Sequence, residues 1–138
     1  MGLSTSLKNA LLDAVFGGVA YTPETDIYIG LSSTTPTVTG TNVTEPSGGA
    51  YARVQKVNNP TNFPAASGAV KSNGTVITFP QATGTWVAGA NLTHVVLYDA
   101  SSGGNFLGYG ALTVAKPVMN GDTASFAIAE LDVTLADA

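Results

Sequence analysis

Apolar residues recur at helical spacing in one part of the chain, close to its beginning. Between residues 3 and 16 they stand three or four positions apart, as Leu3, Leu7, Ala10, Leu11, Ala14 and Val15. This spacing places them on one face of an amphipathic helix. A hydroxyl side chain of Ser4, Thr5 or Ser6 can cap the start, and Gly17 with Gly18 is typical of a helix end. The pattern predicts one helix within residues 1–18, whose apolar stripe docks on its own sheet or on a partner.

The chain after the helix alternates at the period of β-strands. Strand-like runs cover residues 25–32, 51–57, 75–79, 92–99 and 106–114. The run 92–99, LTHVVLYD, is almost continuously apolar, which predicts a central strand that is buried on both faces. The polar turn 101–105 predicts a hairpin between this strand and the next one.

The final run changes parity. Its apolar residues are even-numbered at first and odd-numbered later: Phe126, Ile128, Leu131, Val133 and Leu135. A strand with a period of two cannot keep both sets on one face. We therefore expect a β-bulge or bend near Ala129 and Glu130, as occurs where a strand crosses between two sheets, the alternative being a strand that is covered on both faces.

These elements predict a single domain over residues 1–138. Residues 1–18 hold the helix, and residues 19–138 form an antiparallel β-sandwich of about seven to eight strands, a jelly roll being one form of it. Two long segments, 33–50 and 58–74, each contain a single charged residue. Because such low charge is not typical of freely solvated linkers, we expect extended arms that lie on a neighbouring subunit, with ordinary flexible loops as the alternative.

Charged residues are scarce throughout. They make up 10% of the chain, against about 25% in ordinary soluble domains. Since a monomer is normally kept soluble by a charged coat, the deficit predicts a surface covered by other copies or by a larger shell. The net charge of −4 and the five Lys and Arg residues argue against nucleic acid as a partner. The apolar runs are far shorter than the roughly 20 residues that span a bilayer, so we expect no membrane partner.

No group of residues indicates catalysis or metal binding. His94 is the single histidine, and there is no cysteine. A zinc site would need His94 together with carboxylates from separated loops, and no H-x-x-x-H or comparable spacing exists; a serine nucleophile has no G-x-S-x-G motif here. We therefore expect no catalytic residues, no metal, no cofactor and no enzyme activity, with His94 hydrogen-bonded within its sheet. Glu130 and Asp132 are expected to share the solvated face of an edge strand rather than to form an acid–base pair.

Glycines and aromatic residues suggest close packing. Gly108 and Gly110 share one face of a predicted strand, where missing side chains make room for Trp86 or a tyrosine ring. Trp86 is expected in the core. The alternative is an exposed aromatic platform for carbohydrate, formed with Tyr98 or Tyr109.

Four blocks of the sequence resemble a known group of proteins. In order, they are GLSTSLKNALLDAVFGGVAYTPETDIYIGLSSTTPT, TEPSGGAYARV, NFPAASGAVKSNGTVITFPQATGTW and YDASSGGNFLGYGALTVAKPVMNGDTASF. They resemble small virion structural proteins of tailed bacteriophages, which are often described as tail-fibre-like or minor structural proteins. The resemblance covers almost the whole chain. It implies a non-enzymatic component of the virion that is assembled in the cytoplasm of a bacterial host.

The low charge and this resemblance together predict a capsid decoration, or cement, protein. Such a protein stabilises the head by bridging capsid subunits, so its partners are the major capsid protein or other virion proteins. We expect a homo-oligomer, a trimer or another cyclic form. The alternative is a tail, baseplate or tail-fibre component, with carbohydrate binding as one of its roles, although the chain lacks the repeats of a fibre shaft.

The residues expected at an interface lie in the two neutral arms, 34–47 and 58–64, and at the only arginine. They are Thr34, Thr35, Pro36, Thr37, Val38, Asn42, Glu45, Arg53, Asn58, Asn59 and Phe63. Arg53 is expected to bridge to a carboxylate of its own or a neighbouring chain, the alternative being an exposed charge on a strand.

Overall fold

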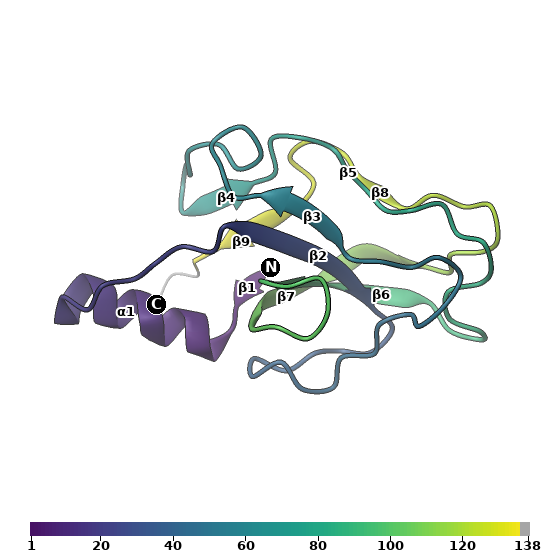
Figure 1. Ribbon diagram of the computed structural model, residues 1–138, viewed down its shortest axis with the longest axis horizontal. Coiled ribbons are helices and arrows are strands. Elements are labelled where there is room, and N and C mark those ends of the chain that lie inside the picture. Colours follow the sequence, from purple (N-terminus) through teal and green to yellow (C-terminus); the bar gives the residue numbers. More distant parts are fainter. Residues whose placement is uncertain (136–138) are drawn as a thin grey trace.

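The computed structural model describes residues 1–135, which form antiparallel β-sheets with one N-terminal helix (Figure 1). The main sheet has five strands in the order β1-β7-β6-β2-β3. These are β1 (Gly2–Leu3), β7 (Phe106–Lys116), β6 (Leu92–Tyr98), β2 (Asp26–Ser32) and β3 (Val54–Val57). The predicted mainly-β fold with one helix is confirmed, as are the hairpin of β6 with β7 and the central place of β6.

Two short antiparallel sheets form the second layer of the sandwich. They pair β4 (Val70–Ser72) with β9 (Asp132–Thr134), and β5 (Ile77–Thr78) with β8 (Ser125–Phe126). A jelly roll would have one continuous sheet in their place. Strand β4 lies inside the segment 58–74 that was predicted to lack regular structure, and the predicted strands 51–57 and 75–79 are shorter than expected.

The core lies between the two layers. Alternate residues of β2 and β6 face it, and the second layer covers them with Ile77, Phe79 and Leu131. Trp86 is 5% exposed and packs edge-on against Tyr51 and Phe79, while its Nε1 donates to the Gly49 carbonyl at 2.9 Å. Trp86 is therefore a core residue, as predicted. Tyr98 is buried as well, so the two do not form an exposed platform for carbohydrate.

The helix α1 (Thr5–Gly17) projects from the end of the sandwich (Figure 1). Both predicted ends are confirmed. Ser4 Oγ accepts from the Leu7 N–H at 3.2 Å, and Gly18, with a φ of 66°, turns the chain so that the N–H groups of Gly18 and Val19 reach the Asp13 carbonyl. However, no residue of the helix is buried. The predicted docking on the protein's own sheet is limited to the first turn, where Leu7 contacts the core.

The glycines of β7 make room for β1, a strand that the sequence analysis missed. A Cβ on Gly108 would lie 2.5 Å from the Gly2 carbonyl oxygen, and one on Gly110 would overlap Met1. The predicted close approach is thus correct, but the N-terminal segment fills the space rather than Trp86 or a tyrosine. The Met1 ammonium donates to the Asp132 carbonyl at 2.6 Å, and the Thr134 N–H donates to the Met1 carbonyl at 3.0 Å. The N-terminal segment therefore connects the two layers.

The change of parity in the last run is resolved by a turn, not by a bulge. Strand β8 ends at Phe126 and β9 begins at Asp132, in different sheets. Between them Ala129 is left-handed, with a φ of 62°, and the Glu130 N–H donates to the Ala127 carbonyl. The break lies at the predicted place. Glu130 and Asp132 therefore do not share one strand, since Glu130 lies in the turn and Asp132 begins β9. Glu130 Oε2 accepts from the Ala127 N–H, and the Asp132 carboxylate accepts from the hydroxyl of Ser72 in β4.

We predict that Gly108→Ala destabilises the protein. The added methyl group meets backbone of β1, which cannot move without losing its pairing with β7. The free energy of unfolding should fall by about 1–3 kcal/mol, as for overpacked cores, and thermal unfolding followed by circular dichroism measures it. Gly84→Ala is the matched control, since its Cβ would meet only ordinary contact at 3.8 Å. Equal melting temperatures for the two variants would contradict this account of β1.

Candidate functional site

The segment 33–50 folds back on its own chain. Thr34 Oγ1 donates to the Asn42 carbonyl at 2.7 Å and lies 3.0 Å from Thr44 Oγ1. Asn42 Nδ2 donates to the Thr35 carbonyl at 2.8 Å, and the Thr5 N–H at the start of α1 donates to the Val38 carbonyl at 2.9 Å. The predicted extended conformation is therefore wrong for this segment. Threonine and asparagine side chains satisfy its backbone locally, and the result is a compact loop.

Part of this loop still points outward. Thr35, Thr37, Val38 and Asn42 are exposed, whereas Pro36 is buried. The hydroxyl of Thr37 is hydrogen-bonded to neighbouring threonine hydroxyls within the loop. The role of these outward residues at an interface stays a prediction.

Glu45 and Arg53 form an ion pair inside the same chain. Arg53 Nη2 lies 2.6 Å from Glu45 Oε2, and Arg53 Nε donates to Glu45 Oε1 at 3.0 Å. The other side of the guanidinium donates to the carbonyls of Ala100 and Gly103, both at 2.8 Å, and its carbon stacks 3.5 Å from the centre of the Tyr98 ring. Since the side chains are 7% and 20% exposed, this confirms the predicted bridge to a carboxylate of the same chain and excludes the exposed-charge alternative.

This group, with Tyr51, is here named the Arg53 cluster, and it covers the outer face of the main sheet around Gly30 and Tyr98. The Tyr51 hydroxyl donates to Glu45 Oε1 at 2.7 Å and accepts from the Leu31 N–H at 2.9 Å. Burial, and then the hydrogen bond to Glu45, raise the pKa of Tyr51. A Cβ on Gly30 would lie 2.5 Å from Glu45 Oε1, so the glycine lets the carboxylate approach β2. Every strong polar group is satisfied here, which indicates a structural role.

The second predicted arm also lies on its own chain. The Asn58 N–H and side chain donate to the carbonyls of Thr25 and Glu24 at 2.9 Å and 2.8 Å, beside the start of β2. Asn59 Oδ1 accepts from two backbone N–H groups of the following turn. Phe63 is buried. The segment 58–64 is thus a tight turn rather than an extended arm, and Phe63 belongs to the interior.

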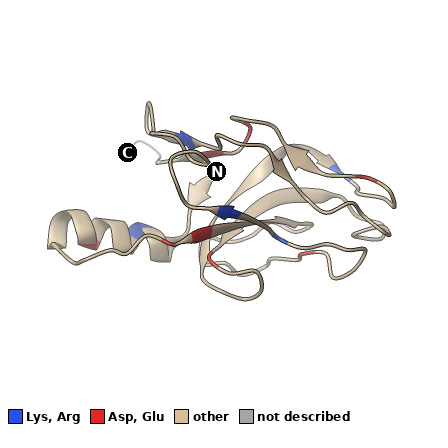
Figure 2. Ribbon diagram, turned by 45° about the horizontal axis from the view of Figure 1, so that its top comes forward, with Lys and Arg blue, Asp and Glu red and all other residues tan. Residues whose placement is uncertain are grey.

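The remaining candidate chemistry is confined to single residues. His94 lies in the middle of β6, where Nδ1 is 2.8 Å from Thr93 Oγ1 and burial lowers the pKa of the ring, as expected for a residue bonded within its sheet. Among residues 1–135, no three histidine or acidic side chains gather in a way that would hold a metal ion. No helix in this part of the chain is long and apolar enough to cross a membrane. Figure 2 shows the charged residues scattered over the helix, the strands and the loops.

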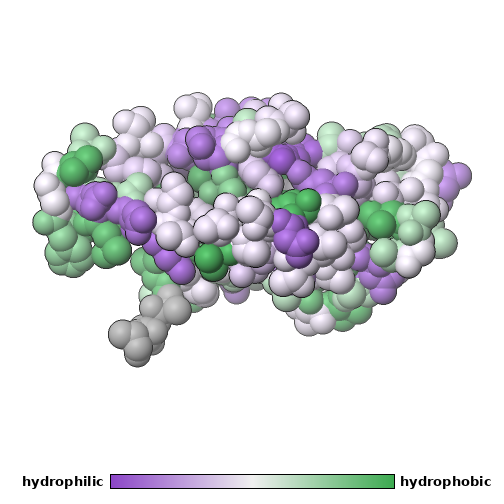
Figure 3. Space-filling view, turned by 90° about the horizontal axis from the view of Figure 1, so that it is seen from below, coloured by the Kyte–Doolittle hydropathy of each residue, from purple (hydrophilic) through white to green (hydrophobic). Residues whose placement is uncertain are grey.

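The tip of α1 carries large apolar side chains that are mostly exposed. Leu12, Val15, Phe16 and Val19 are 55%, 72%, 84% and 59% exposed. Leu12, Val15 and Phe16 are three and four residues apart, which places them on one side of the helix, and Val19 follows directly after the cap Gly18. We name them the helix face; they cover the end of the molecule that is green at the left of Figure 3. The predicted apolar stripe was expected to dock on the protein's own sheet or on a partner, and in this structure the sheet covers little of it.

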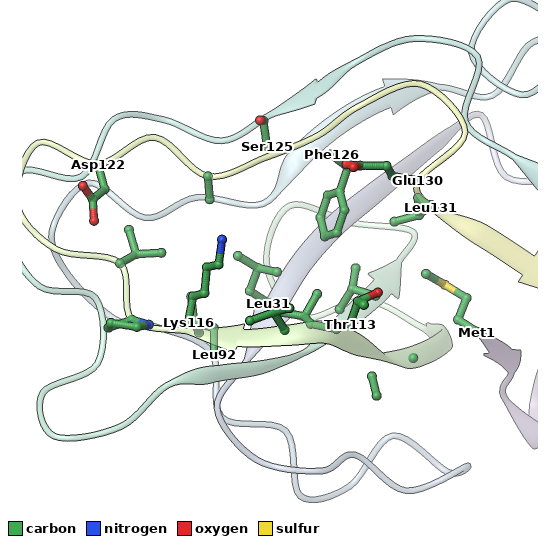
Figure 4. Close-up of a pocket in the computed structure, with 18 of the residues that line it drawn as sticks. Met1, Leu31, Leu92, Thr113, Lys116, Asp122, Ser125, Phe126, Glu130 and Leu131 are labelled. Atoms are coloured by element: carbon green, nitrogen blue, oxygen red, sulfur yellow. The ribbon is translucent and has the colours of Figure 1, made fainter.

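An open groove of about 660 Å³, named here the β7 groove, lies between the layers (Figure 4). Its lower wall is the second half of β7, and its upper wall carries Phe126, Glu130 and Leu131. The core residues Leu31 and Leu92 reach its floor. A register shift explains the opening: His94 pairs with Ala111 but Leu92 pairs with Lys116, so β7 bulges away from β6. No sequence motif indicated this groove.

Comparison with models of known protein families gives a match over residues 2–134 to the model described as podophage GP4 fiber I protein gp80. The matched range contains the helix and every strand from β1 to β9. A search of curated proteins finds no match.

We predict that Arg53→Met destabilises the protein by about 2–3 kcal/mol, because it leaves Glu45 half-buried without its cation and two carbonyls without donors. Urea unfolding followed by Trp86 fluorescence measures the loss. Arg53→Lys should lose less, since the charge remains while the planar fork is gone. Lys8→Met removes a cation from the exposed helix surface and is the control. If Arg53→Met and Lys8→Met unfolded at the same urea concentration, the Arg53 cluster would not have the structural role given to it.

Proposed function

The chain belongs to the podophage GP4 fiber I protein gp80 family, and on that premise we propose that it is a component of the external fibres of a phage, attached through the projecting helix α1. The membership makes it a small phage virion structural protein of the tail-fibre-like kind, in agreement with the resemblance seen in its sequence. What we propose beyond this membership is that the protein attaches through α1 and that it lies on the tail.

The observation that carries the attachment is the helix face. Three large, mostly exposed apolar side chains stand on one side of a helix that projects from the sandwich and buries none of its residues, and Val19 follows directly after the helix cap. Burying one such side chain stabilises a complex by roughly 1.5–3 kcal/mol before the costs of association are subtracted. Amphipathic helices bind protein grooves in this way, with anchors at positions i, i+3, i+4 and i+7. A virion protein with an apolar groove is the kind of partner that this surface fits.

We further propose that the protein acts by binding and not by catalysis. The polar side chains with the strongest interactions are used within the fold: Glu45 with Arg53, His94 with Thr93, and Asp132 with Ser72. Their engagement supports a structural role. Carbohydrate binding through Trp86 has no support, because the ring is enclosed in the core.

Capsid decoration is the second candidate. Its support is the short chain without repeats or heptads, which does not resemble a fibre shaft, together with the low content of charge. In this case the helix face would bind across capsid subunits. The description of the family as a fibre protein supports the first candidate.

We predict that Phe16→Asp abolishes incorporation into particles while leaving the fold intact. Phe16 is 84% exposed, so the charge costs the folded protein little, but it would be buried on docking. Particles assembled with the variant in place of the native chain, then purified and probed by quantitative mass spectrometry, give the occupancy. Val76→Asp, on an exposed valine before β5, is the control and should be incorporated normally. Full occupancy with Phe16→Asp would remove the helix from the proposal.

The position on the particle separates the two candidates. The chain has no cysteine, so Ala90→Cys in an exposed turn gives one site for a gold label. We expect electron microscopy of labelled particles to show gold on the tail. Gold spread over the whole capsid surface would replace the fibre proposal with the decoration candidate.

A further inference from the structure

The molecule carries two unpartnered apolar surfaces that cannot meet within one chain. The helix face lies on the projecting tip of α1, and the β7 groove lies between the layers of the sandwich, beyond β1 (Figures 1 and 4). Leu112 and Val114 on the groove wall and Leu92 on its floor are apolar, like the helix face itself. A helix face of this kind can therefore enter the groove only if it comes from a second copy of the protein.

We propose that the helix face of one copy binds in the β7 groove of a second copy. The contact is heterologous, because two different surfaces meet, so each bound copy still offers one free helix and one free groove. Contacts of this type close into rings or continue as filaments. This proposal rests on the proposed function, in which α1 is the attachment element, and it identifies the partner of α1 as a second copy.

Charge on the two surfaces supports a second copy. Lys8 lies one helical turn before Leu12 on the same side of α1, and it is exposed. The groove is lined by three carboxylates, Asp122, Glu130 and Asp132, against two cations, Lys116 and the Met1 ammonium. Glu130 stands on the wall opposite β7, above the apolar floor (Figure 4). A helix that inserts its apolar tip would carry Lys8 to the rim of this acidic groove, where opposite charges favour correct docking.

The form of the groove suits a helix better than an added strand. A strand would need a regular free edge on β7, but the register shift between the pairs His94–Ala111 and Leu92–Lys116 distorts that edge. The N-terminal segment already takes the regular part, where Gly2 and Leu3 pair with Tyr109 and Gly108. What remains is a wide opening of about 660 Å³ that is lined by both polar and apolar side chains, within the size range of ligand-binding clefts.

Two variants test the heterologous contact. Phe16→Asp damages the helix face and leaves the groove intact, whereas Val114→Asp damages the groove and leaves the helix face intact. Both residues are well exposed, so both variants should fold, which circular dichroism verifies. We expect the native protein to self-associate with rising concentration in sedimentation velocity, and each variant alone to remain a monomer. An equimolar mixture should form a species of twice the monomer mass, because it contains one intact helix and one intact groove.

The control and a charge exchange complete the test. Val76→Asp, outside both surfaces, should associate like the native protein. Lys8→Glu should weaken association at least tenfold, and the pair Lys8→Glu with Glu130→Lys should recover most of it. If Glu130→Lys did not restore the association that Lys8→Glu weakens, while circular dichroism showed a folded protein, the charge pairing between Lys8 and Glu130 would be overturned.

The outcomes separate this inference from the proposed function. A native protein that stays monomeric at millimolar concentration, or a mixture of Phe16→Asp and Val114→Asp that stays monomeric, overturns the second copy as partner. If Phe16→Asp is then absent from particles while Val114→Asp is present, the helix binds a different virion protein and the proposed function stands. Self-association that survives Phe16→Asp but not Val114→Asp would mean that two grooves pair through β7, which also overturns the inference.

Discussion

The position of the loop 33–50 on the main sheet depends on one ion pair. Glu45 and Arg53 form the only salt bridge within residues 1–135, in a chain where 10% of the residues are charged. The guanidinium joins the loop 33–50 to the strand β3 and to the turn after β6. Burying two charges is costly unless each finds further partners, and here Tyr51 and two backbone carbonyls supply them. The pair therefore specifies where the loop lies.

The position of the loop determines what the rest of the surface can do. With the loop held over it, part of the outer face of the main sheet is covered, and most of the strand β6 is buried. The core side is closed less completely, because the second layer consists of two short sheets and β7 bulges. Apolar surface thus remains accessible at α1 and at the β7 groove. In a molecule with so few charges, such patches are typical of surfaces that bind other proteins.

Sequence reasoning located the elements whose signals are local. The helix and its caps at Ser4 and Gly18, the strands β2 and β6, and the hairpin to β7 all follow from periodicity and turn residues. The strand β1 was missed because two residues show no period, although Gly108 and Gly110 did indicate a close approach. The same limit applies to the final run, where parity located the break but could not distinguish a turn from a bulge.

The candidate site was predicted less well, for a physical reason. Threonines such as Thr34 and Thr44 can hydrogen-bond to their own loop or to a neighbouring chain, and the sequence is the same in both cases. Arg53 was singled out because it is the only arginine, and its partner Glu45 proved to be in the same chain. The β7 groove depends on a register shift between strands, which is a property of pairing and not of either strand alone.

The exposed state of α1 has a thermodynamic consequence. The helix has 13 residues and no buried side chain, and a helix of this length is marginal in water without tertiary support. Its capping bonds at both ends, and the contact of Leu7 with the core, are what hold it in the free protein. The far turns should therefore exchange their amide hydrogens faster than the sandwich does. When a partner covers them, part of the binding free energy is used to complete the folding of the helix, so the affinity of the complex will report local order as well as contact area.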